Sequence, residues 1–366
     1  MTKALNLQSV KIENRSLILY TLCREGELSR KELATKLGLT PAAVTKICAG
    51  LIEKGFIREL GEAEQEGRTG RREILLALCL DDKLCFGINA EKDAVTLSVS
   101  TLAGKLLRKK RLPFIEDVDS VIENACEFLE EFGQRDKFSG AGVCIIGSPD
   151  EDDFGIWKES ALASKMEKAF GMPVVIRNNV KAFAESELIY GKTKSTGSVL
   201  FLKWGPGVGS AIITNGIVFT GNDSSVTEIG HYIVNPAGSR CRCGRFGCLE
   251  TEVSEEAIQK ELTAQQPLDE MLKNCDNNTV NILDHKINMV ALALANTATI
   301  LGTDNIVLFG AMFNNAFVAD KLKKQCTRYN SNLGEDMIKV SSLNADGDYI
   351  GACAVCAKKF FFESEE

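Results

Sequence analysis

Residues 228–250 read Glu228-Ile229-Gly230-His231, then nine residues, then Cys241-Arg242-Cys243-Gly244-Arg245-Phe246-Gly247-Cys248-Leu249-Glu250. One histidine and three cysteines fall within eighteen residues of this stretch. Three thiolates and one imidazole form a closed tetrahedral set of zinc ligands, as found in structural sites that keep no open position. We therefore expect a structural Zn²⁺ ion, and the expected ligands are His231, Cys241, Cys243 and Cys248. The alternative is a chance cluster among the thirteen cysteines of the chain.

The composition is that of a globular protein with more than one domain. The chain has 366 residues, of which 45% are hydrophobic and 25% are charged, and this length predicts two or three domains. No stretch reaches the roughly 20 apolar residues that span a bilayer, and the N-terminal residues lack the apolar core of a signal peptide. We expect a cytoplasmic protein without a membrane partner, whose cysteines are reduced thiols and metal ligands.

The charge is unevenly distributed along the chain. The net charge is −7, but residues 1–80 carry 13 Lys/Arg against 10 Glu, and the remainder is strongly acidic. An acidic protein contacts nucleic acid only through a local basic face. Any contact with nucleic acid is therefore expected in the first 80 residues.

Capping and turn signals divide those 80 residues into short elements. Ser29 and Glu32 have the spacing of a helix capping box, Gly38 is a C-terminal stop, and Thr40 precedes Pro41 as the start of another helix. The expected elements are helices over 9–25, 30–37 and 41–54, and strands over 56–60 and 73–78. This order is that of a winged helix-turn-helix, whose later helix enters the major groove of DNA.

The predicted DNA contacts lie on that later helix and on the wing. The helix offers small and hydroxyl side chains and one cation, and the wing offers arginines for backbone or minor-groove contacts. The candidate residues are Thr40, Ala42, Ala43, Thr45, Lys46, Arg68, Arg71 and Arg72. We expect a double-stranded operator with an inverted repeat; the alternative is a small helical bundle that contacts other proteins.

From about residue 82 the chain alternates between strands and helices, which predicts two α/β lobes with a cleft between them. The expected strands are 84–89, 94–100, 106–112, 141–146, 172–176, 199–203, 210–214 and 306–309. The expected helices are 117–133, 180–190, 254–262, 280–301 and 347–362. Within the last of these, Phe360-Phe361-Phe362 is expected to pack on a lobe or on a dimer partner.

The zinc motif and the helix-turn-helix together resemble the repressor branch of the ROK family (repressors, open reading frames and sugar kinases). Glu-x-Gly-His followed by Cys-x-Cys-Gly-x-x-Gly-Cys-x-Glu is the hallmark of that family, and the chain has it complete. The resemblance implies an actin-like, two-lobed sugar-kinase fold, a homodimer or homotetramer, and a sugar or sugar-phosphate effector. The implied domains are a winged helix-turn-helix over 1–80, a first lobe over 81–190 with 347–366 packing back onto it, and a second lobe over 191–346.

The resemblance also implies which residues bind the sugar. Polar side chains suit this role because each buried sugar hydroxyl needs a hydrogen-bond partner. The positions that match the family's sugar contacts are Asn178, Asn179, Glu228, His231 and Glu250. His231 would serve twice, with one ring nitrogen on zinc and the other on the sugar.

Departures from the kinase pattern argue against catalysis. Asn179 stands where kinases have an aspartate base, and an amide does not accept a proton from a hydroxyl. The first phosphate loop reads Asn89-Ala90-Glu91-Lys92-Asp93, and the second contains Pro206 in place of a threonine. We therefore predict a sequence-specific, sugar-responsive transcriptional repressor that is not an enzyme. The alternatives are a sugar kinase with an added DNA-binding domain, and a DNA-binding regulator whose kinase-like part is only a dimerisation scaffold.

Overall fold

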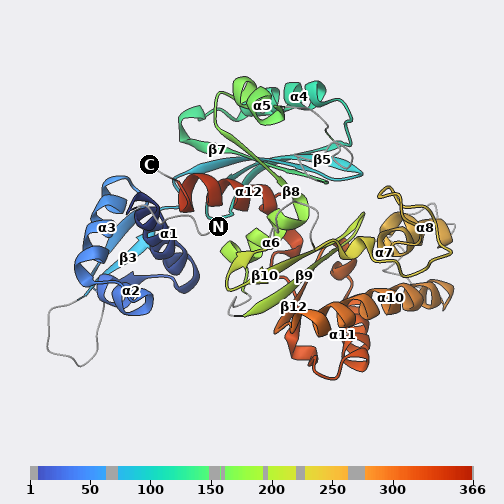
Figure 1. The fold of residues 1–366 in the computed structure, drawn as a ribbon. Helices are drawn as coiled ribbons and strands as arrows, with labels where there is room; N and C mark the ends of the chain where they lie inside the picture. The colour runs from blue at the N-terminus through green and yellow to red at the C-terminus, as the bar shows by residue number, and fades with distance from the viewer. Residues whose placement is uncertain are drawn as a thin grey trace.

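Three β-sheets organise the chain into a small first domain and two larger lobes (Figure 1). The computed structural model describes residues 7–62, 73–147, 157, 161–192, 197–219, 227–262 and 277–364. The predicted mixed α/β architecture, with a winged helix-turn-helix before a two-lobed kinase-like fold, is confirmed. In the described part of the chain, every helix is too short or too polar to cross a bilayer.

The first domain has the predicted order with one additional strand. Its elements are α1 (Leu7–Glu25), β1 (Leu28–Ser29), α2 (Arg30–Leu37), α3 (Pro41–Glu53), β2 (Ile57–Glu62) and β3 (Ile74–Leu78). The predicted capping box is present: the Ser29 hydroxyl accepts from the Glu32 N–H at 3.2 Å, and the Ser29 N–H donates to Glu32 at 2.8 Å. The two-residue strand β1 pairs with β3, so the wing belongs to a three-stranded sheet.

The first lobe is a five-stranded sheet covered on both faces. Its strands, in the spatial order β6-β5-β4-β7-β8, are β6 (Leu106–Pro113), β5 (Ala94–Thr101), β4 (Leu84–Ala90), β7 (Phe138–Ile145) and β8 (Val174–Asn178). α4 (Val118–Phe132) and α5 (Leu162–Phe170) cover one face, and α12 (Ile350–Ala357) covers the other (Figure 1). α5 was not predicted, although Leu162, Met166 and Phe170 recur at helical spacing and are buried.

The second lobe repeats this plan with a sheet in the order β11-β10-β9-β12-β13. Its strands are β9 (Ser198–Trp204), β10 (Val208–Thr214), β11 (Ile217–Val218), β12 (Asn305–Phe309) and β13 (Ile338–Val340). Its helices are α7 (Leu249–Val253), α8 (Glu255–Leu262), α10 (Asn277–Leu301) and α11 (Ala316–Tyr329). The short 3₁₀ helices of the described residues are Arg135–Lys137 in the first lobe and, in the second, Ile229–His231, Ala311–Asn314, Glu335–Met337 and Asn344–Asp346. α7, α11, β11 and β13 were not predicted.

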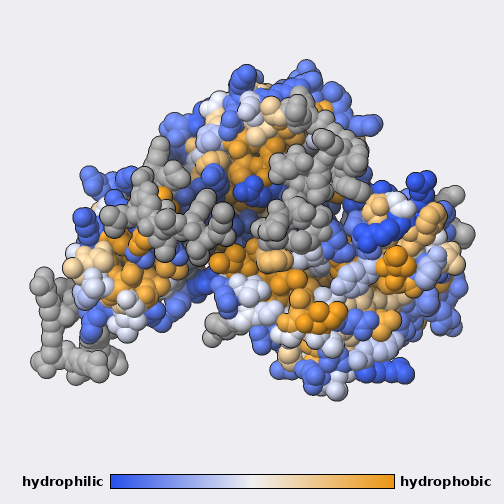
Figure 2. All heavy atoms as spheres, in the orientation of Figure 1, coloured by the Kyte–Doolittle hydropathy of each residue, from blue (hydrophilic) through white to orange (hydrophobic). Residues whose placement is uncertain are grey.

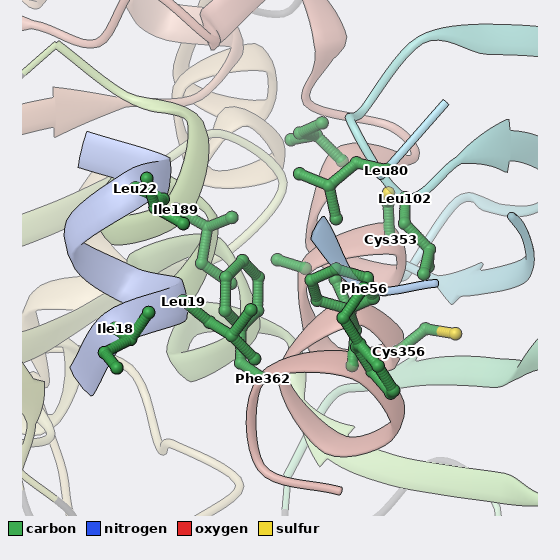
Figure 3. Close-up of a cluster of buried hydrophobic side chains, with 14 of the residues drawn as sticks. Ile18, Leu19, Leu22, Phe56, Leu80, Leu102, Ile189, Cys353, Cys356 and Phe362 are labelled. Atoms are coloured by element: carbon green, nitrogen blue, oxygen red, sulfur yellow. The ribbon is translucent and has the colours of Figure 1, made fainter. Parts of the chain in front are cut away.

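The C-terminal segment differs from its prediction. In place of one helix over 347–362, α12 ends at Ala357 and a π-helical turn follows over Lys358–Phe362. Phe361 and Phe362 are fully buried, and the Phe362 ring stacks on Tyr20 of α1 with 4.6 Å between ring centroids. The Phe362 carbonyl also accepts from the Ser16 hydroxyl at 2.7 Å. Phe361 and Phe362 therefore pack on the first domain, where they complete its core (Figure 3), while Phe360 lies against Gly140 of the first lobe.

The helix α6 (Asn179–Tyr190) connects the region between the lobes with the first domain. Its twelve residues span about 18 Å at 1.5 Å per residue. Its last turn meets α1, where the Cys23 thiol donates to the Ile189 carbonyl at 3.3 Å and Leu22 lies beside Ile189 (Figure 3). The two ends of α6 thus touch the predicted sugar residues and the predicted DNA-binding domain.

Candidate functional site

The four predicted metal ligands lie together. Their donor atoms all fall within 4.8 Å of one another, with 3.5 Å between Cys241 Sγ and His231 Nδ1 and 3.6 Å between Cys243 Sγ and Cys248 Sγ. A tetrahedral site with Zn–S near 2.3 Å and Zn–N near 2.0 Å separates its ligand atoms by roughly 3.5–3.8 Å. The cluster therefore has the composition and the spacing to hold a metal ion.

Two tight turns bring the sulfurs together. The Cys241 N–H donates to the Arg245 carbonyl at 2.7 Å, and the Gly244 N–H donates back to the Cys241 carbonyl at 2.9 Å. Gly247 has a φ of 62°, and a Cβ at that position would lie 1.5 Å from the Asn235 carbonyl oxygen. Only glycine fits there. The turn that brings Cys248 back towards Cys243 therefore requires Gly247.

Burial and mutual proximity disfavour the ionisation of all three thiols at once. Burial and the neighbouring thiols raise the pKa of Cys248 to about 12. At Cys243 burial acts in the same direction, but hydrogen bonds from Arg245 outweigh it and lower the pKa to about 7. Three adjacent thiolates repel one another, so a divalent ion would be needed to stabilise all of them.

His231 and Glu228 lie on the 3₁₀ turn that precedes the cysteine loop, and both are half-buried. His231 directs Nδ1 towards the thiols, so Nε2 is its remaining ring nitrogen. Burial lowers the pKa of His231, which favours the neutral imidazole that a metal requires. Gly230 between them packs against Val208, whose carbonyl oxygen would lie 2.0 Å from an added Cβ.

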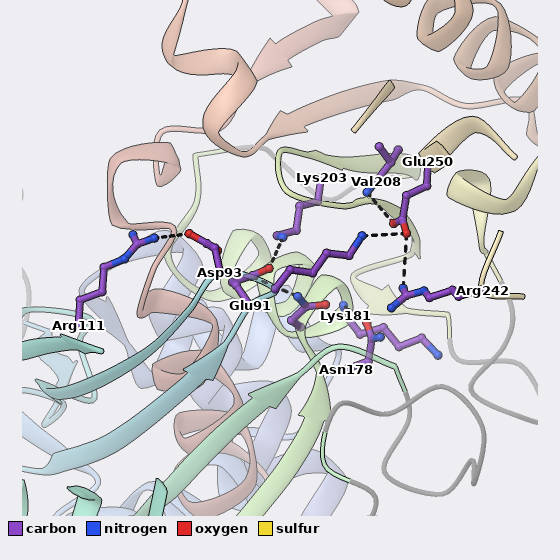
Figure 4. A network of polar contacts seen from close by, with 11 residues as sticks. Glu91, Asp93, Arg111, Asn178, Lys181, Lys203, Val208, Arg242 and Glu250 are labelled. Atoms are coloured by element: carbon purple, nitrogen blue, oxygen red, sulfur yellow. Dashed lines mark hydrogen bonds and ion pairs between the residues drawn. The ribbon is translucent and has the colours of Figure 1, made fainter. Parts of the chain in front are cut away.

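Glu250 lies in the first turn of α7, and both oxygens of its carboxylate have partners (Figure 4). One oxygen accepts from the Val208 N–H at 3.0 Å. The other lies 3.1 Å from Lys92 Nζ and 3.7 Å from a guanidinium nitrogen of Arg242. Burial alone would raise the pKa of Glu250, but Lys92, Arg242 and the Val208 N–H lower it overall. Glu250 is therefore ionised and already paired with cations.

A second ion pair links the lobes beside the first. Glu91, from the turn between β4 and β5, lies 3.0 Å from Lys203 Nζ on β9 and accepts from the Asn179 amide at 3.1 Å (Figure 4). The side chains of Lys203 and Glu91 are only 8% and 16% exposed. Sequence reasoning missed Lys92 and Lys203; the available signal was the charged loop 89–93 in place of a glycine-rich one.

Of the two predicted asparagines, Asn178 has a structural function. Its side-chain oxygen caps α6 by accepting from the Lys181 N–H at 3.1 Å, and its amide donates to the Gly147 carbonyl at 2.9 Å. Asn179 is 4% exposed and directs its amide to Glu91. A role for either residue in sugar binding stays a prediction.

A cleft of about 720 Å³ lies between the lobes, and none of the predicted sugar residues lines it. Glu91, Lys92 and Lys203 do line it, while their partners Asn179 and Glu250 do not. The two ion pairs therefore stand between the cleft and the predicted sugar residues. The lining holds five carboxylates against three cations, a poor environment for the phosphates of a nucleotide. The carboxylates are Glu91, Asp93, Glu255, Glu256 and Asp348.

The predicted recognition helix α3 presents the expected face. Thr40, Ala42, Thr45 and Lys46 are exposed and Ala43 is half-buried, while Val44, Cys48 and Leu51 turn inward. The Thr40 hydroxyl caps the helix by accepting from the Ala43 N–H at 3.3 Å, and the Thr45 hydroxyl donates to the Pro41 carbonyl at 2.8 Å. The predicted wing residues Arg68, Arg71 and Arg72 lie outside the described residues.

Comparison with known proteins assigns both parts of the chain. The model of the ROK family matches residues 85–359, and a winged helix-turn-helix DNA-binding model matches residues 13–58. The DNA-binding transcriptional dual regulator NagC of Escherichia coli K12 is 28% identical over 268 residues, which cover 70% of this chain and 66% of that relative. The xylose repressor of Bacillus subtilis is 23% identical over 96% of both chains.

Solved structures share the fold. A ROK family transcriptional regulator described as a homologue of Escherichia coli Mlc superposes with a TM-score of 0.78 at 21% identity, covering 97% of both chains. A ROK family glucokinase from Streptomyces griseus, in complex with glucose and AMPPNP, superposes with a TM-score of 0.65 at 19% identity over 75% of this chain. Regulators therefore match both the first domain and the lobes, whereas this kinase matches three quarters of the chain.

Proposed function

This chain belongs to the ROK family, and we propose that it is a cytoplasmic, sequence-specific transcriptional repressor of carbohydrate metabolism that responds to a sugar or sugar-phosphate effector. The observation that carries the proposal is the capped, exposed helix α3 within a winged helix-turn-helix that shares one hydrophobic core with the kinase-like lobes. NagC and the xylose repressor are regulators by name and align with the lobes of this chain.

The proposal assigns no phosphoryl transfer to the lobes. Asn179 offers an amide where a base is required, and its amide donates to Glu91. The pair between Glu91 and Lys203 separates the 720 Å³ cleft from the predicted sugar residues. A nucleotide in the cleft would have to displace this pair before its terminal phosphate could reach a sugar.

For the effector we propose the predicted set Asn178, Asn179, Glu228, His231 and Glu250. Support comes from α6, because Asn178 and Asn179 start this helix and Ile189 at its other end contacts α1. A ligand that favours one arrangement of the lobes shifts the population towards it in proportion to its differential affinity. A small rotation of α6 would then move α1 and with it the DNA-binding helix.

We propose that the His231, Cys241, Cys243 and Cys248 cluster holds a structural Zn²⁺ ion. The ion would fix the loop that carries His231 and would orient its imidazole towards the effector. The spacing of the donor atoms and the closed ligand set support zinc over metals that need an open or octahedral site.

The proposed domains are those expected from the sequence: 1–80, 81–190 with 347–366, and 191–346. α12 packs on β4 and β7 of the first lobe, which supports assigning the C-terminal segment there. A homodimer or homotetramer fits the second lobe, whose surface shows hydrophobic patches around α10 and α11 (Figure 2). Leu292 and Ile300 of α10 are 46% and 80% exposed, and Phe317 of α11 is 40% exposed.

One observation favours a second candidate, a regulator whose lobes serve only as a dimerisation scaffold. Glu250 is occupied by Lys92 and Arg242, and Asn178 is used as a helix cap. An effector must therefore compete with the existing contacts of Glu250 and Asn178, and also with the bond from Asn179 to Glu91.

Selection of bound DNA fragments by the full chain, followed by gel-shift assays with and without a panel of sugars and sugar phosphates, tests these functions. The repressor proposal expects an inverted repeat and at least one effector that releases it. Operator binding that no effector changes, together with a Glu228→Ala variant that regulates normally, would support the scaffold. ATP-dependent phosphorylation of any sugar would refute the assignment as a non-enzyme.

A further inference from the structure

Lys92 reaches from the first lobe into the predicted effector site of the second. Its ammonium lies 3.1 Å from Glu250, and its side chain is 31% exposed while that of Glu250 is 9% exposed. A Cβ added to Gly207, on the turn between β9 and β10, would lie 3.9 Å from this ammonium. The loop that carries Lys92 is the one that replaces a phosphate loop, so the cation is held where the lobes meet.

The existing contacts of Glu250 weaken the binding of a neutral ligand at this carboxylate. One carboxylate oxygen is held by the Val208 N–H, and the other is shared by Lys92 and Arg242. A sugar hydroxyl that donates to Glu250 must displace Lys92 or share the oxygen with it. Displacement leaves a half-buried ammonium without its counter-ion, which is unfavourable.

An anionic ligand can pair with the cations that it displaces from Glu250. Among the described contacts of Glu250 itself, Lys92 and Arg242 carry two positive charges against one negative charge, and the neighbouring Glu91 and Lys203 neutralise each other. A phosphate or carboxylate on the sugar would provide the ammonium and the guanidinium with a new partner as a hydroxyl takes over Glu250. Charge-assisted hydrogen bonds of this kind are the strong ones in a partly buried site.

We propose that Lys92 is a specificity-determining residue that selects sugar anions over neutral sugars as effectors. This inference rests on the proposed function, because it assumes that the effector binds at Glu250. Two kinds of anion share the required chemistry, a phosphorylated sugar and a sugar acid.

Isothermal titration of the full-length protein with matched ligands tests the proposal. The ligands are glucose, galactose, mannose and N-acetylglucosamine, the 6-phosphate of each, and glucuronic and galacturonic acids. We expect an anionic member to bind about tenfold to a hundredfold more tightly than its neutral parent, as one or two charge-assisted hydrogen bonds predict. The phosphate and acid arms identify which anion is preferred, and the preference should weaken with added salt.

Two variants isolate the contribution of Lys92. Lys92→Met should reduce the preference for the anion by about tenfold, and should bind the neutral parent at least as tightly as the wild type because Glu250 is released. Lys105→Met, an exposed lysine at the turn between β5 and β6, should leave the preference unchanged. Should Lys92→Met fail to fold, Lys92→Gln and the salt dependence of the wild-type preference provide the same comparison.

An unchanged preference in Lys92→Met, a wild type that prefers neutral sugars, or binding of no member of the panel would overturn the inference. Operator binding, measured on the same samples, distinguishes this failure from failure of the proposed function. If the wild type binds its operator but prefers neutral sugars, only the proposed role of Lys92 is refuted. If the wild type binds no operator, the proposed repressor function is refuted.

Discussion

Separating Lys203 from Glu91 should destabilise the protein more than replacing both. The side chains are 8% and 16% exposed, and they lie 3.0 Å apart. Removing one member of a buried pair leaves an uncompensated charge, which costs about 3–5 kcal/mol. Because Glu91 is not fully buried, we expect the lower end, about 3 kcal/mol, for Lys203→Met and for Glu91→Gln. Met keeps the stem of Lys203, and Gln keeps an acceptor for the Asn179 amide.

The double variant supplies the decisive comparison. With neither charge present, the stability should return to within about 1 kcal/mol of the wild type, since neutral replacement of a buried pair is often harmless. Urea unfolding can be followed through Trp204, which is fully buried beside Lys203 on β9. A Trp157→Phe background leaves Trp204 as the sole tryptophan. Losses that simply add, to within about 0.5 kcal/mol, would show that the two charges do not interact.

Three further outcomes are expected. Protein purified without added metal should contain close to one zinc per chain, and Cys243→Ser should lose the metal and unfold the second lobe more easily, because metal-binding energy is also folding energy. Lys46→Ala should weaken operator binding uniformly and reduce the slope of log affinity against log salt by about one if Lys46 contacts a phosphate. Phe362→Ala should cost about 3–5 kcal/mol and expose amides of residues 7–62 to hydrogen exchange, whereas Phe128→Ala, equally buried in the first lobe, should expose that lobe instead. Metal analysis, fluorescence anisotropy at several salt concentrations and exchange mass spectrometry measure these results, and an unchanged exchange pattern in Phe362→Ala would contradict the shared core.

Local signals in the sequence predicted the elements whose causes are local. Ser29, Glu32 and Thr40 contact backbone groups within three residues of themselves, so their capping roles could be predicted from the sequence. The structure confirms these roles. The metal cluster was equally accessible, because His231 and the three cysteines lie within one short segment. Their donor atoms lie together as the spacing predicted, although the identity of the metal stays a prediction.

Contacts between segments far apart in the sequence could not be predicted from local patterns. Lys92 and Glu250 are 158 positions apart, and Glu91 and Lys203 are 112 apart. Nothing in a single sequence indicates which carboxylate a lysine will meet across an interface between lobes. α11 is a different case: Val318, Leu322 and Cys326 recur at helical spacing and are buried, so its amphipathic pattern was available in the sequence and was overlooked.

Because Phe361 and Phe362 pack in the core of the first domain, that domain cannot complete its folding early in synthesis. Residues 7–62 leave the ribosome early, but the aromatic side chains that fill their core follow some three hundred residues later. Domains usually fold as they emerge during synthesis, yet this one stays incomplete until both lobes have been translated. A nascent or truncated chain would therefore lack a fully packed DNA-binding domain. Incomplete copies, which could not sense an effector, would be disfavoured from occupying the operator.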